Sequence, residues 1–226
     1  MSDTISVAID GPSGAGKSTL ARAVAGRLGY LYVDTGAIYR TIGYHAWKAG
    51  IDPKDGAAVA AELPKLRVEL RYRADGLQSM YLNGEDVTQS IRLPEVSRYA
   101  SDVSAHPAVR SYLLEMQRDL ARTHSVVMDG RDIGTVVLPQ ARVKVFLTAS
   151  AEARAQRRMR ELEQRGTPQP FEQVLSEIQQ RDYNDTHRSA APLRQADDAV
   201  VLDTTDLDFQ ESEEALLCII RKKLEK

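Results

Sequence analysis

The residues most clearly suited to chemistry form a glycine-rich segment close to the start of the chain. They match the phosphate-binding pattern G-x-x-x-x-G-K-[ST] at every fixed position, in the order Gly11, Pro12, Ser13, Gly14, Ala15, Gly16, Lys17 and Ser18. Glycines let backbone N–H groups converge on phosphate oxygens, and the N-terminus of a following helix adds positive potential. We expect Lys17 to bridge the β- and γ-phosphates of ATP and the Ser18 hydroxyl to ligate Mg²⁺. The alternative is a turn that binds nothing, but the strand pattern before the segment and the helical pattern after it favour the phosphate site.

A carboxylate follows a second apolar run. Asp129 comes directly after Val126, Val127 and Met128, at the position where proteins with this phosphate loop hold Mg²⁺, either directly or through water. An apolar run followed by aspartate is common and indicates little alone. Together with the phosphate loop, it predicts that Asp129 is a second magnesium ligand.

Arginines and carboxylates gather in further segments that could hold a second anionic substrate. Residues 34–40 offer a hydroxyl at Thr35 and a guanidinium at Arg40, and residues 129–132 add Arg131 and Asp132. Two later sets recur at helical spacing, so each shares one helix face: Arg181, Asp182, Asp185 and Arg188 in one, and Arg154, Arg157 and Arg158 in the other. Taken alone, these two sets are also typical of exposed, salt-bridged helix faces.

The elements that must position these residues alternate along the chain. Short apolar runs predict strands at residues 4–9, 31–33, 125–128, 143–147 and 199–202, and amphipathic patterns predict helices at 17–28, 37–49, 151–164, 171–188 and 212–224. This alternation indicates an α/β fold, a five-stranded parallel sheet with helices on both faces. Ligands bind such sheets beyond the carboxyl ends of the strands, where the phosphate loop and Asp129 both lie.

One segment departs from this alternation. Residues 66–72 alternate apolar and polar side chains, and the turn signals Asp75-Gly76 and Asn83-Gly84 flank a second short apolar run. We predict a small antiparallel β insertion at 63–87, followed by helices at 93–104 and 107–122 and, later, a mobile connection at 165–170.

Composition limits the classes of function. The chain has 226 residues with 42 % apolar and 27 % charged side chains and a net charge of −2, which fits one globular domain and gives no global attraction to nucleic acid or membranes. The aromatic fraction of 6 % also argues against a nucleic-acid-binding module. The single cysteine, Cys218, lies in an apolar run and is predicted to pack in the core. We see neither a membrane span nor a secretory signal, so we expect a cytoplasmic protein.

Several motifs together resemble the bacterial cytidylate kinases, which belong to the nucleoside monophosphate kinase superfamily. The matching segments are IDGPSGAGKST, DTGAIYR, LNGEDVT, IR followed by EVS, VVMDGRDIGT, RRMRELEQRG and QRDYNDTHRSAAPL, and they span nearly the whole chain. An adenylate kinase would carry DGFPR where this chain carries DGRDIGT. The resemblance implies transfer of the γ-phosphate of Mg-ATP to CMP or dCMP by a monomer.

The resemblance also implies roles for individual residues. ATP would be bound by Gly11 through Thr19, and the acceptor phosphate by Arg40 and Arg131 with the Thr35 hydroxyl nearby. Cytosine would be recognised by Ser101, Arg110 and Asp132, and the sugar by Arg181 and Asp185. Arg188 would be a further cation at the phosphates, and the residues expected to act in catalysis are Lys17, Arg131, Arg158 and Arg188. Residues 36–105 would form a monophosphate-binding subdomain, and residues 152–170 a short lid that carries Arg154, Arg157 and Arg158.

Two other classes of function remain open from the residues alone. A kinase for another small acceptor, such as UMP, AMP or shikimate, would carry the same phosphate loop. A nucleotide-dependent switch would carry it too, but a switch needs one nucleotide site and would not explain arginines after several strands.

Overall fold

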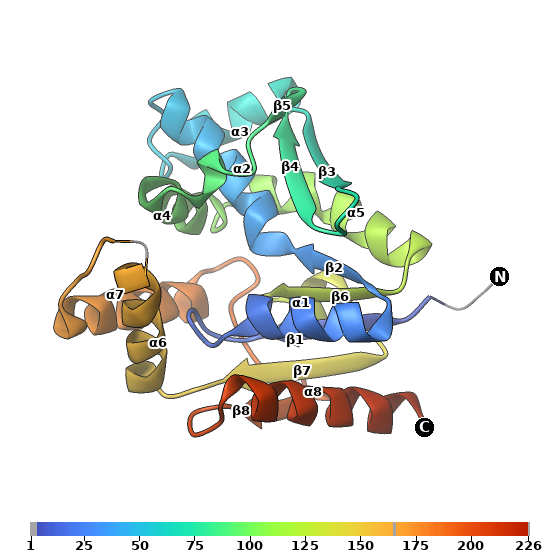
Figure 1. The fold of residues 1–226 in the computed structure, drawn as a ribbon. Coiled ribbons are helices and arrows are strands. Elements are labelled where there is room, and N and C mark those ends of the chain that lie inside the picture. The colour runs from blue at the N-terminus through green and yellow to red at the C-terminus, as the bar shows by residue number, and fades with distance from the viewer. Residues whose placement is uncertain (1–3, 165, 226) are drawn as a thin grey trace.

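The computed structural model describes residues 4–164 and 166–225 and contains the predicted parallel sheet (Figure 1). Its five strands are β1 (Ser6–Asp10), β2 (Leu31–Asp34), β6 (Val126–Gly130), β7 (Val143–Thr148) and β8 (Val200–Asp203), in the order β2-β6-β1-β7-β8. All neighbouring strands run parallel. The central strands β1 and β6 are almost wholly buried, because helices cover both faces of the sheet.

Alternate residues of each strand supply two apolar cores. Val7 and Ile9 of β1 point to the face covered by α1 (Lys17–Leu28) and α8 (Phe209–Leu224), whereas Ala8 between them belongs to the core on the other face. That second core includes α2 (Thr35–Lys48) and α5 (Pro107–Thr123) and is the larger one.

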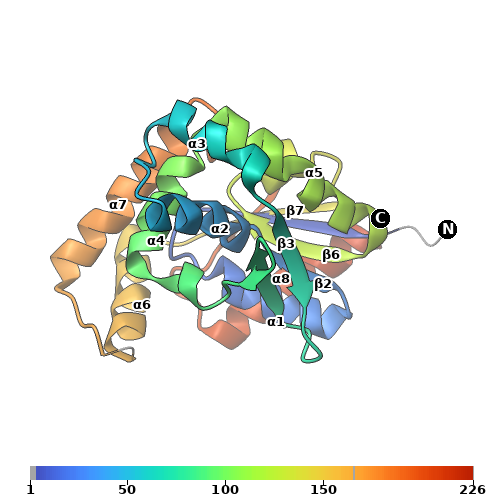
Figure 2. The same cartoon turned by 90° about the horizontal axis from the view of Figure 1, so that it is seen from above.

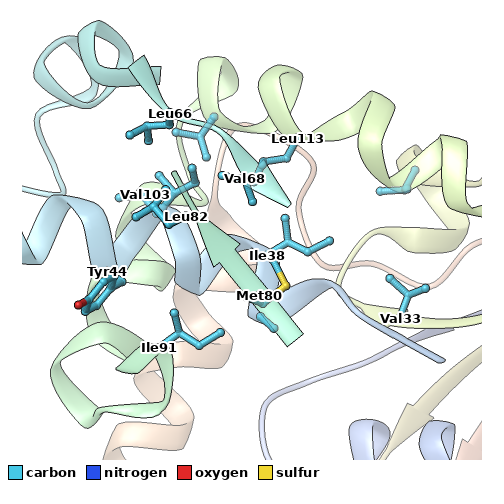
Figure 3. Packing of buried hydrophobic residues seen from close by; sticks show 14 of the residues in the cluster. Val33, Ile38, Tyr44, Leu66, Val68, Met80, Leu82, Ile91, Val103 and Leu113 are labelled. Atoms are coloured by element: carbon cyan, nitrogen blue, oxygen red, sulfur yellow. The ribbon is translucent and has the colours of Figure 1, made fainter. Parts of the chain in front are cut away.

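The second core extends into the predicted β insertion, which contains three strands rather than the two expected. They are β3 (Val68–Tyr72), β4 (Gln78–Leu82) and β5 (Glu85–Asp86), and they pair antiparallel in that order. The β4–β5 turn has positive φ at both Asn83 and Gly84, as a tight two-residue hairpin requires. Figure 3 shows Val68, Met80 and Leu82 of these strands packed with Ile38 and Leu113, and Figure 2 shows the insertion above the sheet, beside α2 and α5.

Other elements complete this region with bounds that the sequence did not predict. Helix α3 (Gly56–Glu62) was missed; its N-terminus is capped by Asp55, whose side chain accepts hydrogen bonds from two backbone N–H groups. Residues Leu63–Lys65, at the start of the predicted insertion, form a 3-10 turn with a proline at its start. A second 3-10 turn, Ser90–Arg92, precedes α4 (Pro94–Val103).

Helices α6 (Ala151–Gln164) and α7 (Phe171–His187) pack against each other beyond the end of β7 (Figure 1). They share a small apolar core of Ala155, Leu162, Val174 and Ile178, separate from the two cores of the sheet. Residue 165 of the predicted connection lies outside the described residues, and Arg188 ends α7 as its C-cap.

The prediction for Cys218 was wrong, because its side chain is exposed: the buried stripe of α8 passes through Leu216, Leu217 and Ile220. Within the described residues, no helix is long and apolar enough to cross a membrane.

Candidate active site

The glycine-rich segment forms a loop between β1 and α1, as predicted. Gly11, Gly14 and Gly16 have φ angles of 152°, 74° and 86°, which other residues rarely adopt. A Cβ atom on Gly11 would lie 1.9 Å from the carbonyl oxygen of Leu147, so the loop also needs glycine there to pass the end of β7. Helix α1 begins at Lys17, which directs its N-terminal N–H groups at the space enclosed by the loop.

The Lys17 side chain is buried at this loop, and its Nζ atom donates a hydrogen bond of 2.6 Å to the carbonyl oxygen of Pro12. Burial, with the nearby guanidinium of Arg131, lowers the pKa of Lys17. A phosphate anion beside Lys17 would reverse this effect by supplying opposite charge. The loop is therefore built for an anion that stabilises the charged amine.

Asp129 lies at the end of β6, and each of its carboxylate oxygens accepts a side-chain hydrogen bond. The Ser18 hydroxyl donates to Oδ2 and the Tyr32 hydroxyl donates to Oδ1, both at 2.9 Å. Burial, and next the charge of Asp34, raises the pKa of Asp129 to about 6. A buried carboxylate beside a serine hydroxyl presents the hard oxygen ligands that Mg²⁺ prefers, and a divalent cation would offset the cost of burying the charge.

The Thr35 hydroxyl, which the sequence places near the acceptor phosphate, donates a hydrogen bond to the protein backbone. Thr35 begins α2 beside the end of β6, where its Oγ1 donates a hydrogen bond of 2.7 Å to the backbone oxygen of Asp129. A Cβ atom on Gly130 would lie 2.8 Å from the same Oγ1, so the two segments meet closely. The hydroxyl proton of Thr35 therefore links β2 and α2 to β6.

One group of arginines surrounds Asp185 of α7. The Nε atom of Arg131 donates to Asp185 at 2.7 Å, and Arg131 and Arg181 both lower the pKa of this carboxyl against the opposing effect of burial. Burial, followed by the charge of Arg131, lowers the pKa of Arg181 to about 10. The Nε atoms of Arg181 and Arg40 have no hydrogen-bond partner among the described residues, while Arg40 pairs with Asp34 at 2.8 Å.

A second group surrounds Asp132, which is only 3 % exposed. Arg110 of α5 donates to one carboxylate oxygen, and Arg188 contacts the other at 3.4 Å. Arg188 also lies 4.0 Å from Asp185, so it joins the two groups. Arg110 lies over the ring of Tyr39, at 5.3 Å from its centroid.

Residues from four helices (α1, α2, α5 and α7) and from strands β2 and β6 thus meet where β1, β2 and β6 end, although the sequence separates them widely. Ser101 lies close by on α4: Arg110 donates at 3.1 Å to the backbone oxygen of Ser104, whose hydroxyl donates to the backbone oxygen of Ser101. Arg158 is more remote; it pairs with Glu161 at 3.0 Å on the surface of α6, and its charge contributes to the lowered pKa of Arg181.

Sequence reasoning missed several residues at this site. Asp10 ends β1 and accepts hydrogen bonds of 2.8 and 2.7 Å from the N–H groups of Ile133 and Gly134, which fixes the turn after Asp132. Tyr32, whose hydroxyl donates a hydrogen bond to Asp129, was predicted only to be part of a strand. Each acts through a partner almost one hundred residues or more away, so no local signal marks it, although an aspartate that ends a strand before the glycine loop is a usable hint.

Arg154 and Arg157 lie on α6 with Arg158, at the helical spacing that the sequence predicted, but they are not part of an exposed, salt-bridged face. Arg154 is buried against the phosphate loop, and Arg157 donates to the side chain and backbone of Thr204.

Comparison with known proteins identifies the family of the chain. A family model described as "Cytidylate kinase" matches residues 7–222. A cytidylate kinase from Caldicellulosiruptor bescii is 51% identical over 207 residues, covering 92% of this chain and 91% of that protein. Another, from Anoxybacillus flavithermus, is 46% identical over 225 residues, covering 100% of both chains. Among solved structures, an uncharacterized protein from Eubacterium ventriosum is similar in fold, with a TM-score of 0.52 and 11% identity over 99% of this chain and 100% of that one.

Proposed function

The chain belongs to the cytidylate kinase family, and on this premise we propose that it transfers the γ-phosphate of ATP to CMP or dCMP, giving ADP and CDP or dCDP. The observation that carries the choice of acceptor is the buried carboxylate of Asp132 between Arg110 and Arg188. Cytosine presents an N4 amino donor where uracil presents an O4 acceptor, so a fixed carboxylate favours cytosine.

At the donor side, we assign ATP to the loop from Gly11 to Thr19. The backbone N–H groups and Lys17 neutralise phosphate charge, and the loop holds the γ-phosphate in line with the acceptor. Ser18 and Asp129 are the residues that would hold Mg²⁺, and the ion would add positive charge at the β- and γ-phosphates. Tyr32 keeps the Asp129 carboxylate oriented from its other side.

At the acceptor side, we assign the CMP phosphate to Arg40 and Arg131 and the sugar to Arg181 and Asp185. The unpartnered Nε atoms of Arg40 and Arg181 support this assignment, because buried guanidinium groups require acceptors that a nucleotide supplies. Planar guanidinium groups also bind phosphate oxygens in pairs, which explains the use of arginine instead of lysine.

The remaining assignments concern base recognition and charge at the reacting phosphate. Ser101, Arg110 and Asp132 would recognise cytosine. Arg188, in contact with Asp132 and Asp185, would join that group to the phosphates, and Arg158 would approach from α6. The acceptor oxygen is an ionised phosphate, so the reaction requires no strong general base, and we assign none.

Initial rates of ADP formation with CMP, dCMP, UMP and AMP under saturating Mg-ATP test the proposal. We expect CMP and dCMP to be the best acceptors. Greater kcat/KM for UMP or AMP would overturn the assignment of the acceptor, and ATP hydrolysis that does not depend on any of these acceptors would favour the nucleotide-dependent switch.

We also propose that residues 152–170 act as a lid and residues 36–105 as a monophosphate-binding subdomain, and that both close on the substrates to exclude water. Hydrogen exchange measured with CMP and a non-hydrolysable ATP analogue should slow in both segments. Unchanged exchange in residues 152–170 would contradict the lid. The proposed enzyme is a cytoplasmic monomer, and light scattering of the purified protein would test the oligomeric state.

A further inference from the structure

Two charged side chains of the helical pair α6–α7 contact the phosphate loop at Ser13. Arg154 of α6 donates a hydrogen bond of 2.9 Å from Nη1 to the carbonyl oxygen of Ser13, and the same Nη1 lies 2.6 Å from Oδ2 of Asp182 on α7. The other oxygen of Asp182 accepts a hydrogen bond of 3.3 Å from the Ser13 N–H group. The backbone N–H and the backbone carbonyl of Ser13 are therefore both bound by one ion pair.

This ion pair is buried and oriented, unlike most surface pairs. The Arg154 side chain is 7% exposed and the Asp182 side chain 22% exposed. The Nε atom of Arg154 donates 2.9 Å to the carbonyl oxygen of Ala149, just before α6, which fixes the guanidinium plane. Charge-assisted hydrogen bonds of this kind are stronger than neutral ones, and a shielded pair loses less to solvent screening than an exposed pair.

The backbone of the loop is also in direct contact with α6. A Cβ atom on Gly14 would lie 3.3 Å from Cβ of Arg154, which is tighter than ordinary packing. Figure 1 shows α6 and α7 beside the turn between β1 and α1, at the end of the sheet where the strands finish. The position of Gly14, and with it the N–H groups that follow, thus depends on where Arg154 lies.

We propose that Arg154 and Asp182 are positioning residues that hold the Ser13 peptide, and so fix the phosphate loop in the conformation that binds the triphosphate of ATP. We call this pair the loop clamp. It makes ATP affinity depend on the contact of this pair with the loop, whereas neither Arg154 nor Asp182 is among the residues assigned to CMP. The inference rests on the proposed function only in taking ATP as the donor.

The alternative is that this ion pair only stabilises the packing of α6 against α7. Its loss would lower the free energy of unfolding and would weaken both substrates to the same extent. Loss of a clamp on the loop weakens ATP selectively, and it exposes the Ser13 N–H group to exchange.

The test uses Asp182→Asn, which keeps the shape of the side chain and removes its charge. The matched control is Glu177→Gln on the same helix, where the carboxylate contacts only the Gln173 side chain in the described structure. Dissociation constants for a non-hydrolysable Mg-ATP analogue and, separately, for CMP are measured by calorimetry, and exchange of the Ser13 amide by mass spectrometry.

We expect Asp182→Asn to weaken the ATP analogue about tenfold, with CMP affinity changed less than about twofold and faster exchange at Ser13. Glu177→Gln should match the wild type in its affinity for the ATP analogue, its affinity for CMP and its exchange rate at Ser13. Unchanged affinity for the ATP analogue, or equal weakening of both ligands, overturns the clamp.

A second pair keeps the test decisive if Asp182→Asn does not fold. Arg154→Lys preserves the charge but cannot reach the acceptors with the same fork, and Arg160→Lys on the exposed side of α6 is its control. Selective weakening of the ATP analogue by Arg154→Lys supports the clamp, and wild-type affinity overturns it. Because these are binding measurements, they can be interpreted even if the wild type does not phosphorylate CMP. Failure to phosphorylate CMP would contradict the proposed function but not the loop clamp.

Discussion

Replacing Asp132 with alanine tests how the site distinguishes cytosine from uracil. The Asp132 side chain is only 5% exposed and is held by Arg110 and Arg188. Its carboxylate can therefore neither rotate away from the O4 oxygen of uracil nor be solvated readily by water. A hydrogen bond to a charged group contributes about 1.5–3 kcal/mol. Its loss should lower kcat/KM for CMP by about tenfold to hundredfold, whereas UMP has no such bond to lose.

Asp132→Ala also changes the free energy of unfolding, and this effect must be separated from its effect on the preference for CMP over UMP. Removing the carboxylate leaves Arg110 without its counterion and Arg188 with Asp185 alone, at 4.0 Å. Removing one partner of a buried ion pair lowers the free energy of unfolding by on the order of 3–5 kcal/mol. We expect the lower end of this range for Asp132→Ala, because the pair is not wholly enclosed. The ratio of kcat/KM for CMP to kcat/KM for UMP does not depend on the folded fraction, since one enzyme preparation supplies both values.

A coupled assay for ADP formation gives that ratio directly. Asp119→Ala is the matched control, because it removes one of the two carboxylate partners of Arg122 on the exposed face of α5. The control should leave the ratio unchanged, while Asp132→Ala lowers it about tenfold or more. Equal proportional losses on CMP and UMP would refute the role of Asp132 in reading the base.

Three further substitutions test other parts of the site. Tyr32→Phe removes a hydrogen bond to Asp129 and should lower the free energy of unfolding by about 1 kcal/mol and raise the Mg²⁺ concentration for half-maximal rate; an unchanged magnesium titration would contradict the orienting role of the hydroxyl. Burial raises the pKa of Asp10 to about 6 from an ordinary 3.8, so the folded state binds this proton more tightly than the unfolded chain and the group's contribution to stability falls as pH rises. We therefore expect the free energy of unfolding of the wild type, measured relative to that of Asp10→Asn in urea, to rise by about 2 kcal/mol as pH falls from about 7 to about 4.5. A difference between the two proteins that does not change with pH would contradict the raised pKa. Gly130→Ala would place a Cβ atom 2.6 Å from the Ile133 side chain, so the melting temperature and kcat/KM for CMP should both fall; full activity would show that the turn can move.

The arrangement of the sheet was predictable because its signals are local. Short, mostly apolar runs at β1, β6 and β7 are typical of strands covered on both faces, and the glycine-rich motif places the phosphate loop directly after the first of them. Parallel strands then bring their carboxyl ends to one edge, which is enough to predict that the loop and Asp129 lie together. The short elements were harder: α3 and β5 have too few residues to show a period.

The sequence alone determined the fold class, the phosphate loop and, through its motifs, the family, and it predicted that Ser18 and Asp129 lie together. Only the tertiary structure decided which arginine faces which carboxylate: Asp132 between Arg110 and Arg188, Asp185 with Arg131, and Arg154 on the loop. The physical reason is range. Helix and strand periodicity and loop glycines act within a few residues of one another, whereas ion pairs depend on distance in space, and the chain packs groups together that its sequence keeps far apart.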